Sequence, residues 1–139
     1  MRIGELARSV GTTARTVRYY EEIGLLADAG SRPAGGHREY TDDDLERLRL
    51  ILRLKDLLGL SLDELRGVMG GEDARAVRRR EWHETSDPAE RHRILTEALA
   101  HTDALLAHVR RRSETLAEFE AELNERRQRH VHRLRELVP

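Results

Sequence analysis

The chain has no cysteine among its 139 residues, and aromatic residues make up only 4% of it. Disulfides, thiolate metal sites and thiol redox switches are therefore excluded. There is also no apolar run of about 18 residues and no signal-peptide pattern, so we expect no membrane contact and a cytoplasmic location. Since neither a nucleophile–base constellation nor a glycine-rich phosphate loop appears, we expect no enzymatic activity and no cofactor.

Charge is abundant but almost balanced. The 25 basic and 26 acidic side chains give a net charge of −1. This average argues against non-specific binding of nucleic acid by the whole surface. The charges are clustered, however, and the three tyrosines, Tyr19, Tyr20 and Tyr40, all lie near arginines in the N-terminal part. This grouping indicates a local binding surface rather than a distributed one.

The first 26 residues have the pattern of a helix-turn-helix. One apolar face recurs at helical spacing at Ile3, Leu6, Ala7 and Val10. Gly11 is expected to end this helix, and Thr12 to cap the next one. Two short helices around a glycine turn are typical of a helix-turn-helix unit.

The second of these helices separates two kinds of side chain. With 3.6 residues per turn, Ala14 and Val17 can pack inward. Arg15, Arg18 and Tyr19 then point roughly the opposite way, with Thr16 at the border. A short helix with small apolar groups behind it and Arg, Tyr and Thr in front suits a DNA groove.

Residues 27–41 are rich in glycine and predict a loop or a small β-hairpin, with Gly35 and Gly36 as its turn. The returning strand would run from His37 to Tyr40. A hairpin that follows a helix-turn-helix is a wing.

Residues 42–69 predict two further helices, the first capped by Thr41 and the second by a capping box of Ser61 and Glu64. The segment 70–87 leaves two interpretations open, a short helix or a loop. It begins with two glycines and contains the only tryptophan, Trp82. We therefore expect a DNA-binding domain over 1–70, a connecting segment over 71–87 and a long helix with its tail over 88–139.

From Pro88 to about Leu137 the sequence predicts one helix with no internal proline or glycine. Its apolar residues follow alternating steps of three and four, at Leu95, Leu99, Leu106, Val109, Leu116, Leu123, Leu134 and Leu137. Polar residues interrupt this seam at Thr102, Ser113, Glu120, Arg127 and His130. A helix of about 50 residues spans roughly 75 Å and cannot bury such a seam on a small domain. We expect a second copy of the chain to cover it.

Three strings make the chain resemble the MerR family of bacterial regulators. They are IGELARSVGTTARTVRYYEEIGLL (Ile3–Leu26), SRPAGGHREYTDDDLERLRLI (Ser31–Ile51) and GLSLDEL (Gly59–Leu65). The resemblance implies a mainly α fold, in which a winged helix-turn-helix precedes a long helix that forms an antiparallel coiled-coil dimer. It also implies that the homodimer binds a pseudo-palindrome in double-stranded promoter DNA and distorts it for RNA polymerase.

The resemblance carries over to individual residues. Arg18, Tyr19 and Tyr20 match the recognition helix, although Tyr20 lies nearer its buried side and has a mixed role. Arg38 and Tyr40 match phosphate contacts of the wing. Arg15 and Thr16 match positions that vary with the operator, which makes them candidate readers of sequence. The complete predicted DNA-binding set is Thr13, Arg15, Thr16, Arg18, Tyr19, Tyr20, Arg32, His37, Arg38 and Tyr40.

The effector is unknown, and any effector would have to bind the helical part or the dimer interface. Trp82 beside an arginine run, together with His101 and His108, gives the candidate residues. The competing interpretation is that Trp82 pins its segment onto the long helix and that the histidines are exposed or lie in the seam. Metal-binding pairs on one helix are usually four residues apart, and no two histidines have that spacing, so we expect no metal site.

Two other classes of function remain possible at this point. An architectural protein would bend DNA without an effector, although such proteins are usually little more than the winged domain. An interaction protein would pair its long helix with a different chain.

Overall fold

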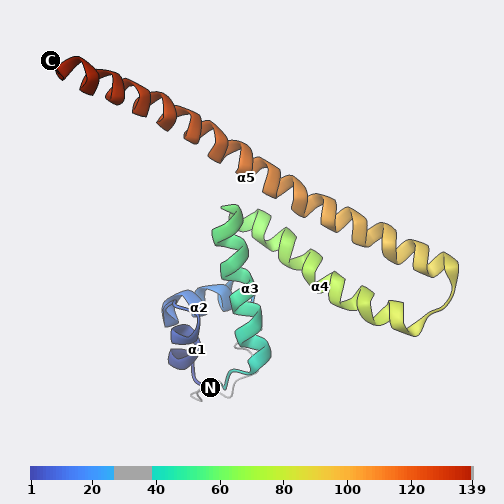
Figure 1. Cartoon of the computed structure of the whole chain (residues 1–139). Helices are drawn as coiled ribbons and strands as arrows, with labels where there is room; N and C mark the ends of the chain where they lie inside the picture. The colour runs from blue at the N-terminus through green and yellow to red at the C-terminus, as the bar shows by residue number, and fades with distance from the viewer. Residues whose placement is uncertain (27–38, 139) are drawn as a thin grey trace. The chain divides into compact units, whose positions relative to one another are not determined.

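The structure is a computed structural model that describes residues 1–26 and 39–138. These residues form five helices and no strand: α1 (Ile3–Ser9), α2 (Ala14–Glu22), α3 (Asp42–Leu58), α4 (Leu62–Glu84) and α5 (Pro88–Leu137) (Figure 1). The predicted mainly α class is therefore confirmed. The chain divides into two compact units, residues 1–83 and 84–139. The predicted wing falls almost entirely outside the described residues.

The turn between α1 and α2 has the predicted form but a different cap. Gly11 has a positive φ of 72°, which glycine adopts without steric cost. Thr13, not Thr12, caps α2, because its hydroxyl accepts a hydrogen bond from the backbone N–H of Thr16 at 3.2 Å. The N–H of Thr12 still donates to Ala7 O, at 2.9 Å, so Thr12 belongs to the turn.

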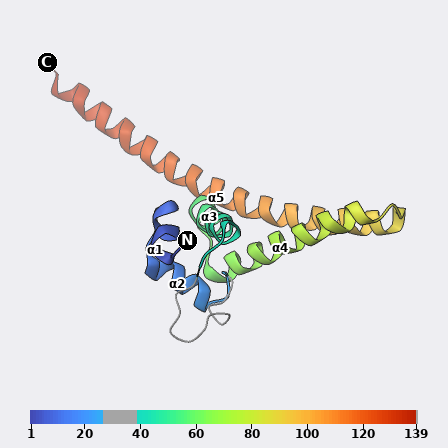
Figure 2. The ribbon, with the colours of Figure 1, turned by 90° about the horizontal axis from the view of Figure 1, so that it is seen from below.

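The first unit has a small apolar core that draws on all four of its helices. The most deeply buried side chains are Leu6, Val17, Leu48, Ile51 and Met69. Figure 2 shows α3 nearly end-on, with α1, α2 and the beginning of α4 around it. The core thus holds α2 from behind and leaves its other face open.

Arg47 of α3 links three parts of this unit. Its Nε donates to Leu25 O, just after α2, at 2.6 Å. Its guanidinium also pairs with both carboxylate oxygens of Asp73 in α4, at 2.6 and 3.2 Å. Because both side chains are partly exposed, the ion pair contributes roughly 1 kcal/mol or less to stability. Its larger effect is to fix the end of α2 against α3 and α4.

The prediction that a helix ends near residue 69 is wrong, because α4 continues through Gly70 and Gly71 to Glu84. Gly70 and Gly71 each cost about 1 kcal/mol relative to alanine within a helix. The packing of Val68 and Met69 before them, and the good helix formers after them, offset that cost. The open question over 70–87 is therefore answered by a helix up to Glu84 and a short connection to α5.

We expect Gly70→Ala to stabilise the protein by about 1 kcal/mol, since alanine is the better helix former. A Cβ at Gly70 would meet no atom within 4 Å. Urea unfolding measures the difference. Gly59→Ala is the matched control and should destabilise, because Gly59 ends α3 with a φ of 59°. A loss of stability in Gly70→Ala would show that this face of α4 is covered in solution.

The second unit is dominated by α5, which begins with Pro88 at its first position and runs for 50 residues. Only Ile94 of this helix is buried. The predicted apolar residues of the seam are exposed in the single chain, from Leu123 at 38% to Leu137 at 79%. None of the described helices has the length and apolar character needed to cross a membrane.

Candidate nucleic-acid interface

The outward face of α2 presents the predicted basic and aromatic residues. Arg15 and Arg18 are exposed, and Tyr19 is 46% exposed. Val17, between them in sequence, is completely buried. The predicted division of this helix into an inner apolar and an outer Arg/Tyr face is confirmed.

The first turn of α2 adds hydroxyl groups to this face. Thr13 is exposed and Thr16 is half-buried, and their hydroxyl oxygens lie 3.0 Å apart. The first turn contains no acidic residue. The partial positive charge of a helix N-terminus is therefore not neutralised there, which favours a nearby phosphate group.

Two tyrosines of the predicted set are buried, as expected in part for Tyr20 but not for Tyr40. Tyr20 is 2% exposed, and its ring lies against that of Tyr19, with centroids 5.7 Å apart and planes tilted by 51°. Tyr40 is 4% exposed. Tyr20 and Tyr40 can therefore affect DNA binding only indirectly, by holding exposed residues in position.

The partner of Tyr40 is a carboxylate that sequence reasoning missed. The Tyr40 hydroxyl donates to Glu21 Oε1 at 2.5 Å, and Glu21 is only 5% exposed. The one signal in the sequence was that Glu21 shares a helical side with Ala14 and Val17. This bond joins α2 to Tyr40, which directly follows Glu39, the residue at which the described chain resumes.

Tyr40 is also held by the N-terminus. Its N–H donates to Met1 O at 2.7 Å, and the ammonium group of Met1 donates to Tyr40 O at 2.9 Å. The same ammonium group pairs with the Glu39 carboxylate at 3.1 Å. Residues 39 and 40 are thus tied to the chain start and to α2. Arg32, His37 and Arg38 lie within the segment 27–38, outside the described residues, and their DNA contacts stay predictions.

We expect Tyr40→Phe to destabilise the first unit by about 1.5–3 kcal/mol, since it removes a buried hydrogen bond to a carboxylate. Thermal or urea unfolding measures this loss. A direct phosphate contact predicts a different pattern, in which DNA affinity falls at unchanged stability. Tyr19→Phe, at the exposed neighbouring ring, is the matched control and should leave stability nearly unchanged.

The effector candidates are divided between the two units. Trp82 is half-buried in α4, whereas His101 and His108 are half-buried in α5. His108 Nδ1 lies 3.2 Å from a guanidinium nitrogen of Arg111. Within residues 1–26 and 39–138, no three His, Asp or Glu side chains gather closely enough to hold a metal ion. The effector role of these three residues stays a prediction.

Comparison with known proteins supplies the context for this interface. Residues 1–72 match the family described as MerR HTH family regulatory protein. The HTH-type transcriptional regulator YfmP of Bacillus subtilis (strain 168) is 39% identical over 97 residues, which cover 70% of this chain and 69% of YfmP. The nodulation protein NolA of Bradyrhizobium sp. (strain NC92) is 49% identical over 70 residues, 50% of this chain but only 29% of NolA.

Two solved structures share the fold. A protein of Listeria monocytogenes assigned to the MerR family has a TM-score of 0.55 at 20% identity, covering 99% of this chain and 93% of its own. The transcription regulator PbrR691 of Ralstonia metallidurans CH34, solved in complex with lead(II), has a TM-score of 0.51 at 31% identity, covering 92% and 85%. The similarity to both extends beyond the helix-turn-helix into the long helix.

Proposed function

Because this chain belongs to the MerR HTH family of regulatory proteins, we propose that it controls transcription as a homodimer bound to a pseudo-palindromic promoter operator. Its place in the family makes it a transcription regulator with a DNA-binding helix-turn-helix, not an enzyme. The operator, the dimer and the distortion of DNA are the proposed parts. RNA polymerase at the same promoter is the proposed protein partner.

The observation that carries the proposal is the exposed face of α2. Arg15, Arg18 and Tyr19 are presented together, while Val17 and Tyr20 anchor the helix from behind. Arginine can donate two hydrogen bonds to guanine in the major groove. We assign base reading to Arg15 and Arg18, with Thr16 beside them.

The remaining residues of the interface would hold the DNA backbone. Thr13 and Tyr19 have exposed hydroxyl-bearing side chains suited to phosphate oxygens. Glu21 and Tyr40 would act behind them, because their buried hydrogen bond fixes the base of the predicted wing against α2. Arg32, His37 and Arg38 would add wing contacts.

The exposed seam of α5 supports the homodimer. A row of leucines that is 38–63% exposed from Leu95 to Leu134 favours association with a matching helix. Two copies would place two recognition helices on two half-sites, which accounts for a pseudo-palindromic operator.

The proposed mechanism is distortion of the promoter. Bending or untwisting DNA costs a few kcal/mol, and protein contacts can supply or withhold that energy. The dimer would thereby change the relative placement of promoter elements for RNA polymerase. An effector bound to the helical part would switch between the two states.

Footprinting on the promoters of this gene and its neighbours tests the proposal. We expect one protected inverted repeat centred between promoter elements. Absence of any protected repeat would overturn the proposal that the chain binds a promoter operator. Cooperative coverage of many sites with no such centre would favour the architectural alternative instead.

A further inference from the structure

The seam of α5 repeats with a strict heptad over its whole length. The apolar and polar members alternate in steps of four and three from Leu95 to Leu137, so each occupies an a or d position. Arg110 and Arg112 lie next to the seam, at e and g positions. These flanking positions face the partner helix and influence its alignment.

In a parallel pair Glu120 and Arg127 of the seam would each face their own copy, so we take the pair as antiparallel, which permits only a few alignments of two such helices. An a residue of one helix packs against a d residue of the other, so allowed alignments differ by whole heptads. Most of them leave either Leu95 and Leu99 or Leu134 and Leu137 without a partner. Three alignments cover most of the seam, and they place Leu106 opposite position 116, 123 or 130 of the partner.

The composition of the seam excludes one of the three. With Leu106 opposite the partner's His130, Val109 would face the partner's Arg127. Among the a–d residue pairs that face each other across the two helices, only one kind would then be apolar on both helices. The same alignment brings Arg112 close to Arg126 of the partner subunit, a contact between like charges.

Charge excludes a second alignment. With Leu106 opposite the partner's Leu116, the two-fold axis passes close to position 111. Arg110 and Arg112 would then each face their own copy in the partner. Like charges at such close positions are destabilising.

We propose that α5 pairs with a second copy in the remaining alignment, with Leu106 opposite Leu123 of the partner subunit. This inference rests on the proposed homodimer and specifies its register. Leu95 then faces the partner's Leu134, and Arg112 faces the partner's Phe119. The two-fold axis passes between positions 114 and 115.

This alignment also provides for the polar residues of the seam. Glu120 faces the partner's Val109 and lies beside the partner's Arg110, which can neutralise its carboxylate. Thr102 donates its hydroxyl proton to Ala98 O at 3.0 Å within its own helix. The hydroxyl oxygen of Thr102 can therefore still accept a hydrogen bond from the partner's Arg127.

Disulfide mapping tests the register directly, because the chain contains no cysteine. The double variant Leu106→Cys/Leu123→Cys should crosslink to a covalent dimer on mild oxidation. Leu106→Cys/Leu116→Cys and Ser113→Cys/Leu123→Cys report the two rejected alignments and should crosslink at least tenfold more slowly. Two cysteines on one helix are at least about 15 Å apart in each variant, too far for an internal disulfide.

The possible outcomes separate the register from the homodimer. Fastest crosslinking of either rejected pair would overturn the register while leaving the dimer in place. Efficient crosslinking of the single variant Leu123→Cys would indicate parallel helices and would also overturn it. A monomer for the unmodified chain in light scattering would instead overturn the proposed homodimer, and the register with it.

Discussion

Arg18→Ala should weaken binding to the operator by at least about 30-fold while leaving the dimer intact. A bidentate contact between arginine and a base contributes about 1–3 kcal/mol of discrimination, and the dimer uses it twice. Arg18 is exposed, so its removal should not disturb the core of the first unit. A mobility-shift titration on the protected repeat measures the loss.

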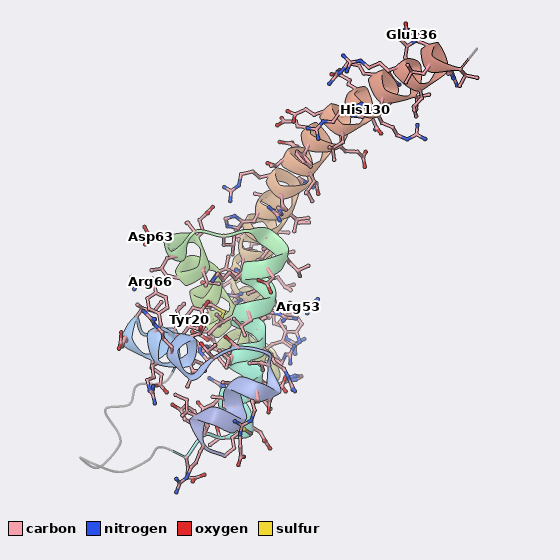
Figure 3. The ribbon with its side chains drawn as sticks, turned by 90° about the vertical axis from the view of Figure 1, so that its left-hand side faces the viewer. Tyr20, Arg53, Asp63, Arg66, His130 and Glu136 are labelled. Atoms are coloured by element: carbon pink, nitrogen blue, oxygen red, sulfur yellow. The ribbon has the colours of Figure 1, made fainter. Side chains whose placement is uncertain are left out.

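Arg53→Ala provides the matched control for this prediction. Arg53 is also an exposed arginine of the same unit, on the opposite side of α3 from Tyr20 (Figure 3). Apart from the small effect of one positive charge fewer, Arg53→Ala should change operator affinity by less than about twofold. Equal effects of the two substitutions would mean that α2 is not the DNA-contacting helix. A fall in the salt dependence for Arg18→Ala would assign Arg18 to phosphate rather than to a base.

The helical periodicity of the sequence was sufficient to predict which face of α2 is exposed. A nine-residue helix with one apolar side has few ways to pack, so Val17 and Arg18 could be placed correctly from spacing alone. The same holds for α5, whose length and exposed apolar seam follow from the spacing of its residues. These features depend on local repeat patterns, which the sequence displays directly.

Features that depend on tertiary contacts were not predictable in the same way. The choice between Thr12 and Thr13 as cap depends on where the turn at Gly11 closes. The continuation of α4 through Gly70 and Gly71 depends on packing that offsets their low helix propensity. The Glu21–Tyr40 bond joins residues 19 apart in sequence, and nothing local marks either as a partner.

The Glu21–Tyr40 bond changes how the predicted interface should be understood. The sequence pattern placed Tyr40 on the predicted wing beside Arg38, and the resemblance to the MerR family implied that it meets phosphate. Its burial makes it a link between α2 and the segment that precedes it. The proposed interface therefore combines exposed residues that would meet DNA with buried residues that hold α2 and Tyr40 in place.

Leu123→Ala should weaken the dimer by at least about a thousandfold. Leucine-to-alanine substitutions at buried sites cost about 2–5 kcal/mol, and each seam residue occurs twice in the dimer. Leu123 lies in the seam in every alignment considered, so this prediction does not depend on the proposed register. Sedimentation or light scattering over a concentration series measures the dissociation constant.

Leu57→Ala is the matched control, because Leu57 is 56% exposed on α3 and lies outside the seam. It should leave the dimer unchanged. Leu123→Ala should also lower operator affinity, since a monomer can occupy only one half-site at a time. The helical content of the Leu123→Ala protein should fall on dilution, because the seam of α5 then lies in water without a partner helix. A Leu123→Ala protein that remains dimeric at low concentration would show that surfaces other than the α5 seam hold the two copies together.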